Sequence, residues 1–294
     1  MIFNDQTISG QDGRKLRFSE AGQPDGMPVL VHHGTPGSRL LSHPLIEDAK
    51  SRGIRLISYD RPGYGGSTSQ PGRSVASAVD DVAAIAKHLK IDRLCVWGAS
   101  GGGPHALACA ALLPDLVAAA AAIASLAPYL ADGLDWLVGM GEDNIEEYGA
   151  ALDGRDSLNQ YIEVHAPGLL SATPEGPIEA LRSLLSPVDI AVVTGDFADR
   201  MIKNMSEAIT NSRDGWIDDD IAAITPWGFK LSSIRIPVLL MHGAQDQFVP
   251  FSHGEWLASH ISNAHTRLSA DDGHLSLTVS GIPEVHAWLL DKMS

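Results

Sequence analysis

The chain has 294 residues, of which 44% are hydrophobic and 19% charged, so it has enough apolar material for a sizeable core. Its formal net charge of −15 argues against nucleic acid or an anionic membrane surface as a partner. No apolar run reaches the roughly 18 residues of a membrane helix, and we expect no signal peptide. Cys95 and Cys109 fall in expected core elements, so we expect small buried hydrophobes in a cytoplasmic, reducing environment.

Short apolar runs and helical patterns alternate along the first 127 residues. The apolar runs predict strands at 6–9, 15–20, 28–32, 54–59 and 94–97, with a further buried strand and its flanks at 116–126. Helical spacing predicts helices at 40–52 and 74–89, and a third helix after Gly101. Strands that alternate with helices are joined by right-handed crossovers, so we expect an α/β fold with a mostly parallel central sheet flanked by helices.

The pattern changes between residues 128 and 228. This stretch holds 19 acids and 5 bases, a net charge of −14, whereas the rest of the chain has a net charge of −1. Apolar residues at helical spacing mark one face at Leu137, Met140, Ile145, Tyr148 and Leu152, and another at Ile190, Val193, Phe197, Met201, Met205 and Ile209. We therefore expect 128–228 to be an all-helical insertion in an α/β core formed by 1–127 and 229–294. The second part of that core is expected to contain strands at 237–241 and 266–268, a helix at 252–260 and a C-terminal helix.

A strand that ends at Gly98 is followed by Ser100 and Gly102, which gives a G-x-S-x-G spacing at a strand-to-helix turn. This turn places the serine hydroxyl above the sheet, and the two glycines remove Cβ atoms that would collide across it. At the start of a helix, free backbone N–H groups and the helix dipole favour a developing oxyanion. The pattern favours a nucleophilic Ser100 over an incidental serine in a glycine-rich turn.

Two further polar residues follow strands whose carboxyl ends share this edge of the sheet. Asp246 comes after the strand at 237–241, and His274 comes after the last strand. An imidazole can take the serine proton and a carboxylate can hold its tautomer, so Ser100, Asp246 and His274 in this order predict a catalytic triad. Asp271 and Asp272 lie closer to His274 in sequence, but short carboxylates before a glycine are typical of a polar turn.

Four segments together resemble the α/β-hydrolase family, and the resemblance covers essentially the whole chain. They are His33-Gly34-Thr35-Pro36-Gly37, Asp60-Arg61-Pro62-Gly63-Tyr64-Gly65-Gly66-Ser67, Gly98-Ala99-Ser100-Gly101-Gly102, and Gly243-x-x-Asp246 with Gly273-His274. The resemblance implies that the backbone N–H groups of Thr35 and Gly101 form an oxyanion hole and that His33 braces the loop. It also implies a structural turn at 60–67 and a helical cap over the pocket at 128–228. Related dehalogenases carry aspartate where this chain has Ser100, which argues against dehalogenation.

The fold does not name the substrate. Proline iminopeptidases carry a similar HG-x-P-G loop and acidic cap residues that hold the amino terminus of the substrate, but Thr35, Ala99 and Gly101 depart from their usual pattern. We expect the acidic pairs and runs of the insertion to form a solvated face: Asp218-Asp219-Asp220 and Glu146-Glu147. Three tryptophans of the insertion could line an acyl pocket, although plain packing is the expectation for each: Trp136, Trp216 and Trp227.

Three functional hypotheses remain open on the sequence alone. The first is a serine hydrolase that cleaves a small or medium carboxylic ester through an acyl-enzyme. The second is an amidase, an aminopeptidase of the proline iminopeptidase type or an acyltransferase that uses the same triad. The third is a non-catalytic binding protein, which generally loses a triad residue, and none is lost here. The 12 histidines show no metal-ligand spacing, so we expect a small-molecule substrate and neither metal nor cofactor.

Overall fold

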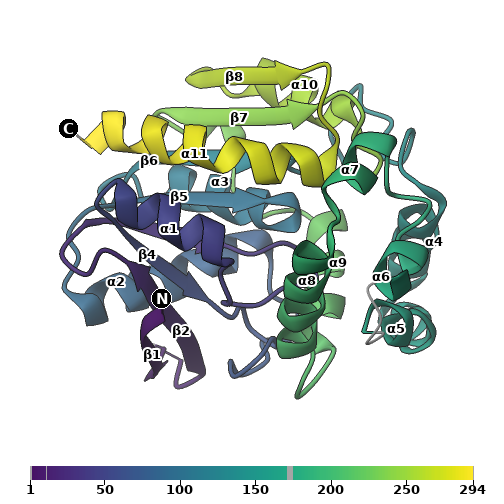
Figure 1. Ribbon diagram of the computed structural model, residues 1–294, viewed down its shortest axis with the longest axis horizontal. Helices are drawn as coiled ribbons and strands as arrows, with labels where there is room; N and C mark the ends of the chain where they lie inside the picture. The colour runs from purple at the N-terminus through teal and green to yellow at the C-terminus, as the bar shows by residue number, and fades with distance from the viewer. Residues whose placement is uncertain (1, 11, 171–174, 294) are drawn as a thin grey trace.

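The computed structural model describes residues 2–10, 12–170 and 175–293. Within these residues the chain forms one eight-stranded sheet with the order β1-β2-β4-β3-β5-β6-β7-β8, and helices cover both of its faces (Figure 1). The strands are β1 (Ile2–Ser9), β2 (Lys15–Gly22), β3 (Met27–His32), β4 (Ile54–Tyr59), β5 (Leu94–Ala99), β6 (Val117–Ile123), β7 (Val238–Gly243) and β8 (Ala264–Ser269). Strands β3 to β8 run parallel, and β1 and β2 form an antiparallel hairpin at one edge. The predicted mostly parallel sheet is confirmed.

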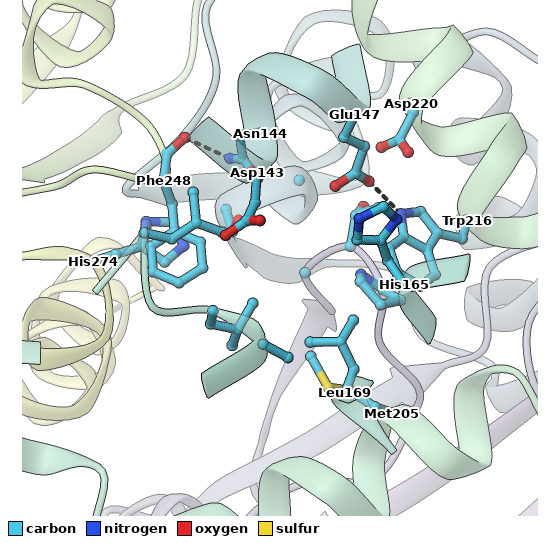
Figure 2. A pocket seen from close by; sticks show the side chains of 18 of the residues that line it. Asp143, Asn144, Glu147, His165, Leu169, Met205, Trp216, Asp220, Phe248 and His274 are labelled. Carbon is cyan, nitrogen blue, oxygen red and sulfur yellow. Dashed lines mark hydrogen bonds between the residues drawn. The ribbon is translucent and has the colours of Figure 1, made fainter. Parts of the chain in front are cut away.

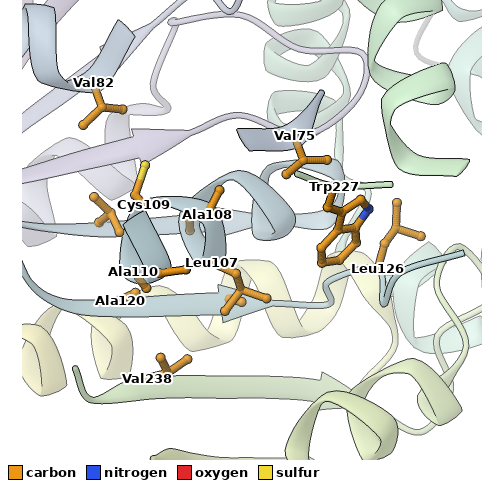
Figure 3. Packing of buried hydrophobic residues seen from close by; sticks show 14 of the residues in the cluster. Val75, Val82, Leu107, Ala108, Cys109, Ala110, Ala120, Leu126, Trp227 and Val238 are labelled. Atoms are coloured by element: carbon orange, nitrogen blue, oxygen red, sulfur yellow. The ribbon is translucent and has the colours of Figure 1, made fainter. Parts of the chain in front are cut away.

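Two layers of helices pack against the sheet. Helices α1 (His43–Ser51) and α11 (His274–Met293) cover one face, whereas α2 (Ala78–Leu89), α3 (Gly103–Leu112) and α10 (Phe251–His260) cover the other (Figure 1). Alternate residues of the central strands enter the two layers, as the two-residue period of a strand requires. Leu94 and Val96 join the layer of α2 and α3, part of which Figure 3 shows, whereas Cys95 and Trp97 join the layer of α1 and α11. Both cysteines are free and buried, as predicted.

Helix α1 starts later than its apolar pattern predicts. The pattern predicts a start at Leu40, but the helix begins at His43. Ser42 keeps an extended backbone as the N-cap residue, and a proline lies in the first turn, where its missing N–H has no helical partner to lose.

Between β6 and β7 the described residues form helices and no strand, as predicted. The helices are α4 (Glu142–Asp153), α5 (Arg155–Leu169), α6 (Glu175–Ala180), α7 (Pro187–Val192), α8 (Gly195–Ala208) and α9 (Asp214–Ile224), and we call α4 to α9 the helical segment. Figure 1 shows these helices at the end of the sheet where β5 and β7 point. None of the helices in the described part of the chain is long and apolar enough to cross a membrane.

Both predicted helical faces of this segment are partly wrong. Leu137 and Met140 precede α4, because Gly139 takes a φ of +94° that ends any continuous helix before Gly141. The second face is divided between α7 and α8, since the extended backbone of Thr194 starts a new helix.

Candidate active site

Ser100 lies at the sharp turn between β5 and α3, with a left-handed backbone φ of 54° that a side chain rarely adopts. The turn is tight on both sides. A Cβ at Gly98 would overlap the carbonyl of Gly102, and a Cβ at Gly102 would overlap the carbonyls of His32 and His33 at the end of β3. The glycines two residues from Ser100 are therefore needed for this strained turn to form beside the neighbouring strand.

His274 and Asp246 are brought together by the loops that follow β7 and β8. Asp246 Oδ2 lies 2.7 Å from His274 Nδ1, and both residues are buried. The other carboxylate oxygen accepts the backbone N–H groups of Phe248 and Val249 at 2.9 and 2.8 Å. With Asp246 Oδ2 as acceptor, Nδ1 carries a proton and Nε2 is left free to accept one. The ring of Phe248 stacks on His274 at a centroid distance of 4.5 Å.

The surroundings of His274 favour its protonated form. Burial acts to lower its pKa, but the charge and hydrogen bond of Asp246, together with the charge of Asp189, raise the pKa above its ordinary value. His242, behind this pair, keeps Nε2 bonded to the carbonyl of Val249 at 2.8 Å, and burial lowers its pKa. His274 is thus the member of this pair of histidines that is suited to take up a proton.

Asp271 and Asp272 do not contact His274 by any hydrogen bond among the described residues. Asp272 accepts the hydroxyl of Ser269 at 2.6 Å and that of Ser276 at 3.4 Å, which ties the turn to the start of α11. Asp271 is exposed. Both carboxylates therefore occupy the polar turn that the sequence predicts for them.

A cavity of about 520 Å³ joins the sheet edge to the helical segment. Ser100 and His274 line it together with Gly34, Thr35 and Gly101. No hydrogen bond joins Ser100 Oγ to His274 in the described part of the chain; bonds of this kind often tighten only when substrate is bound. From the helical segment the lining includes Glu147, Tyr148, His165, Trp216 and Asp220, several of which Figure 2 shows around the cavity.

The loop after β3 lies against the turn of Ser100. A Cβ at Gly101 would overlap the hydroxyl of Thr35, so these two residues are immediate neighbours. His33 is held on both ring nitrogens: Nδ1 lies 2.7 Å from the carbonyl of Gly34, and Nε2 accepts the backbone N–H of Arg61 at 3.2 Å. Burial, followed by the charge of Arg61, lowers the pKa of His33 well below its ordinary value. A neutral His33 therefore fixes the backbone of this loop.

A buried ionic cluster extends from the loop into the helical segment. Asp219 of α9 accepts the hydroxyls of Thr35 and Tyr64 at 2.9 and 2.8 Å, and the guanidinium groups of Arg61 and Arg73 at 2.5 and 2.6 Å. Arg61 also donates to the carbonyls of His33 and Gly34. Although burial alone would raise the pKa of Asp219, the two arginines hold it well below its ordinary value. Asp219 is thus an ionised anchor for the loop that carries Thr35.

Asp60 begins the turn that supplies Arg61 to this cluster. Its carboxylate accepts the backbone N–H groups of Arg39 and Gly66 at 2.8 and 3.0 Å, so the segment at 60–67 folds back on itself. The same carboxylate also lies 3.0 Å from the guanidinium of Arg39.

The expectation of a solvated acidic face is wrong for α9. Asp218, Asp219 and Asp220 are 3%, 5% and 2% exposed. Three consecutive helical residues span about 200°, so on a helix packed on several sides at least one of them must turn inward. This geometric signal was present in the sequence, but the arginines that neutralise Asp219 come from distant segments. Glu146 is exposed, as predicted, whereas Glu147 lines the cavity.

Glu147 and Asp220 form a carboxyl pair at the wall of the cavity. Trp216 Nε1 donates to Glu147 Oε1 at 2.5 Å, as the dashed line in Figure 2 marks. Among the described residues, no donor forms a hydrogen bond with Asp220 Oδ2. The carboxyl group of Glu147 is close enough to act on that of Asp220. Burial is the main cause that raises the pKa of Asp220 well above its ordinary value, and the charge of Glu147 raises it further. Burial also raises the pKa of Glu147. Both shifts favour the protonated form of a carboxyl group in this pair.

The three tryptophans differ in position. Trp136 and Trp227 are packed in the layer of α2 and α3, which agrees with the expectation of plain packing. Trp216 lines the cavity and holds Glu147, so packing alone does not describe it.

Comparisons with known proteins agree with the observed fold. The model of the alpha/beta hydrolase fold family matches residues 27–279. Two curated relatives are the non-heme chloroperoxidase of Streptomyces lividans, 28% identical over 84% of each chain, and the bifunctional esterase/perhydrolase DCH of Acinetobacter calcoaceticus, 26% identical over 83% of each chain. A solved structure of a putative aryl esterase from Burkholderia cenocepacia covers 99% of both chains with a TM-score of 0.69 at 22% identity.

The central sheet, the turn at Ser100 and the matched family model together indicate a hydrolytic enzyme. The chain belongs to the alpha/beta hydrolase fold family.

Proposed function

We propose that the protein is a serine hydrolase that cleaves a small or medium carboxylic ester through an acyl-enzyme. The observation that carries the proposal is the 2.7 Å contact of Asp246 with His274 at a cavity that Ser100 also lines. Ser100 is the nucleophile, His274 the general base and Asp246 the triad acid. Gly98, Gly102, Gly34 and His33 support the turn and the loop.

In the first half of the reaction, His274 Nε2 takes the proton of Ser100 Oγ as the oxygen attacks the ester carbonyl carbon. The carbonyl oxygen becomes an oxyanion, which the backbone N–H groups of Thr35 and Gly101 stabilise. The C–O bond to the leaving alcohol then breaks, and the imidazolium gives its proton to that alcohol. The product that stays behind is an acyl group on Ser100.

In the second half, His274 takes a proton from water, and the resulting hydroxide oxygen attacks the acyl carbon. The second oxyanion collapses, the carboxylic acid leaves, and the imidazolium returns its proton to Ser100 Oγ. Asp246 orients His274 and stabilises its imidazolium in both halves, in keeping with the raised pKa of His274.

The choice of an ester is supported by the relatives and by the cavity. One curated relative is named an esterase/perhydrolase and one solved structure a putative aryl esterase. The cavity lining includes apolar side chains suited to an acyl chain: Leu126, Leu169, Leu181, Leu184, Met201 and Met205. Its volume of about 520 Å³ suits a ligand of small or medium size.

A second function is favoured by one observation, the carboxyl pair of Glu147 and Asp220 at the cavity wall. A charged amine could take the place of the proton that the raised pKa values favour on this pair, which would suit an aminopeptidase or amidase that uses the same triad. Acyl transfer is a further use of the acyl-enzyme, with another alcohol or amine in place of water.

Turnover of a panel of p-nitrophenyl esters and of a prolyl-naphthylamide tests the proposal, with Ser100→Ala as the matched variant. We expect ester cleavage by the native protein and only a trace by Ser100→Ala, which loses one hydroxyl and keeps its fold. Preferred cleavage of the naphthylamide would favour the aminopeptidase. No turnover of any substrate would favour a non-catalytic binding protein on the same fold.

A further inference from the structure

Asp189 lies in the helical segment but contacts the start of α11. It belongs to α7, 85 residues before His274 in the chain, and it is fully buried. Figure 1 shows α7 beside the end of α11 that begins with His274. The carboxylate therefore joins the helical segment to the helix that carries the proposed general base.

One carboxylate satisfies the first turn of α11. Asp189 Oδ2 accepts the backbone N–H of His274 at 3.1 Å, and Oδ1 accepts those of Leu275 and Ser276 at 2.8 and 2.9 Å. The first turn of a helix leaves such donors without helical partners, and a negative charge there is favourable. Ser186 holds the carboxylate in place by donating its hydroxyl to Oδ2 at 2.8 Å.

Gly273 leaves the space that this contact needs. A Cβ at Gly273 would overlap Asp189 Oδ2 and would lie 2.5 Å from Ser186 Oγ. The glycine before His274 is thus explained by the approach of a side chain from the helical segment.

The contact acts on His274 in two ways. His274 is the first residue of α11, so the position of its ring follows the position of the helix start. The positive end of the helix dipole disfavours an imidazolium at that place, and the charge of Asp189 opposes this effect. Among the described residues, Asp246 and Asp189 raise the pKa of His274, and the charge of His274 in turn lowers the pKa of His242.

We propose that Asp189 is a positioning residue that caps α11 and thereby holds the His274 ring between Asp246 and Ser100. The helical segment then orients the general base in addition to lining the cavity. Asp189 is not part of the cavity lining, so it acts through His274 and not on the substrate. The inference rests on the proposed function, because it assigns His274 the role of base.

The test compares Asp189→Asn and Asp189→Ala with Asp48→Asn. Asp48 is a matched control because its carboxylate also contacts α11, at His286 Nδ1 with a distance of 2.7 Å, but far along the helix from His274. Each variant is measured for kcat, KM, the pH dependence of kcat/KM, and the NMR titration of the His274 ring. The ring titration needs no turnover, so it gives a result even if the protein cleaves no ester.

For Asp189→Asn we expect kcat to fall roughly 10- to 100-fold, because small misplacements of a reacting group have effects of that size. KM should stay unchanged. The pKa of His274 should fall, since a negative charge is lost beside a helix N-terminus, and the acid limb of kcat/KM should move to lower pH. Asp189→Ala should lower kcat and the pKa of His274 further, whereas Asp48→Asn should change neither kcat nor that pKa.

An unchanged His274 titration and an unchanged kcat in correctly folded Asp189→Asn would overturn the proposal and leave Asp189 a structural cap. Should Asp189→Ala fail to fold, Gly273→Ala takes its place, since its methyl group displaces the carboxylate, and the same shift of the His274 pKa is expected. A shifted titration in a protein that hydrolyses no ester would retain the positioning contact and reject the proposed function.

Discussion

The sheet edge and the helical segment both place buried carboxyl groups at or behind the wall of the cavity, but these groups are stabilised in different ways. At the sheet edge, the Asp246 carboxylate accepts hydrogen bonds from backbone N–H groups two and three residues further along the chain. It also contacts the His274 imidazole of the loop after β8. In the helical segment, adjacent residues of α9 have opposite behaviour. The pKa of Asp219 is lowered by Arg61 and Arg73, whereas the pKa of Asp220 is raised by burial and by Glu147.

This difference shows that the surroundings of a carboxyl group, and not its residue type, decide its role. The loops at the sheet edge bring the proposed reacting groups together over short stretches of chain. The helical segment supplies carboxyl groups whose partners lie far away in sequence, such as Asp219 with Arg61 at a separation of 158 residues. Variants of the sheet edge should therefore affect catalysis. Variants of the α9 carboxyl groups should mainly affect stability, whereas Asp189 of α7 is the residue of the helical segment that we expect to affect kcat through His274.

The largest expected effect is on kcat, from Asp246→Asn. The substitution keeps the shape of the side chain but favours the wrong tautomer of His274, and the precedent of serine triads gives a loss of roughly 10³- to 10⁴-fold in kcat. Asp271→Asn and Asp272→Asn are matched controls from the neighbouring turn and should stay within about tenfold, or ~1.4 kcal/mol of barrier. Steady-state kinetics on variants with equal circular dichroism checks this. A large loss of kcat in Asp271→Asn or Asp272→Asn, together with retained activity in Asp246→Asn, would contradict the assignment of Asp246 as the triad acid.

The next effect is on stability, from Asp219→Asn. Removal of this charge leaves Arg61 and Arg73 buried without their anion, and broken buried pairs cost about 3–5 kcal/mol. Asp214→Asn is the control on the same helix: the Asp214 side chain is 44% exposed, and we expect a loss below about 1 kcal/mol. Chemical denaturation gives both free energies of unfolding. Equal losses in the two variants would show that the Asp219 cluster does not anchor the loop.

The smallest effect should be that of Asp220→Asn on the free energy of unfolding, and this effect should depend on pH. The raised pKa of the carboxyl pair means that the folded protein holds a proton that the unfolded chain releases more readily. The contribution of this bound proton to the stability of the folded protein is fully present below the ordinary carboxyl pKa. It is lost as the pH rises through the raised pKa of the pair. An amide at 220 can donate to Glu147 at any pH, so the variant should gain stability relative to the native protein as the pH rises above the ordinary carboxyl pKa, by on the order of 1 kcal/mol. The exposed Glu146→Gln should show no such trend. A stability difference for Asp220→Asn that does not change with pH would argue against a raised pKa of the pair.

Much of the sheet could be predicted from the sequence because its signals are local. Strand β4 has the bounds that its apolar run predicts, and β5 leads into the serine turn as expected. The proximity of Asp246 to His274 also followed from the sequence, since the carboxyl ends of parallel strands meet at one edge.

The helical segment was harder to predict because its partners are distant. Apolar spacing did not reveal the break at Thr194 or the irregular chain before Gly141. Nothing near Asp219 in sequence indicates that Arg61 and Arg73 neutralise it, so a solvated face was the simpler expectation. Asp189 has no local sequence signal either, and the need for glycine at 273 becomes evident only from the structure, where a Cβ would overlap the Asp189 carboxylate.

The nucleophilic role of Ser100 is tested most directly by treating the native protein and Ser100→Ala with a fluorophosphonate and mapping the adduct by peptide mass spectrometry. We expect one phosphonyl adduct on Ser100 of the native protein, with loss of ester turnover, and none on Ser100→Ala. An adduct on another residue, equal labelling of Ser100→Ala, or full esterase activity without an adduct would contradict a nucleophilic Ser100.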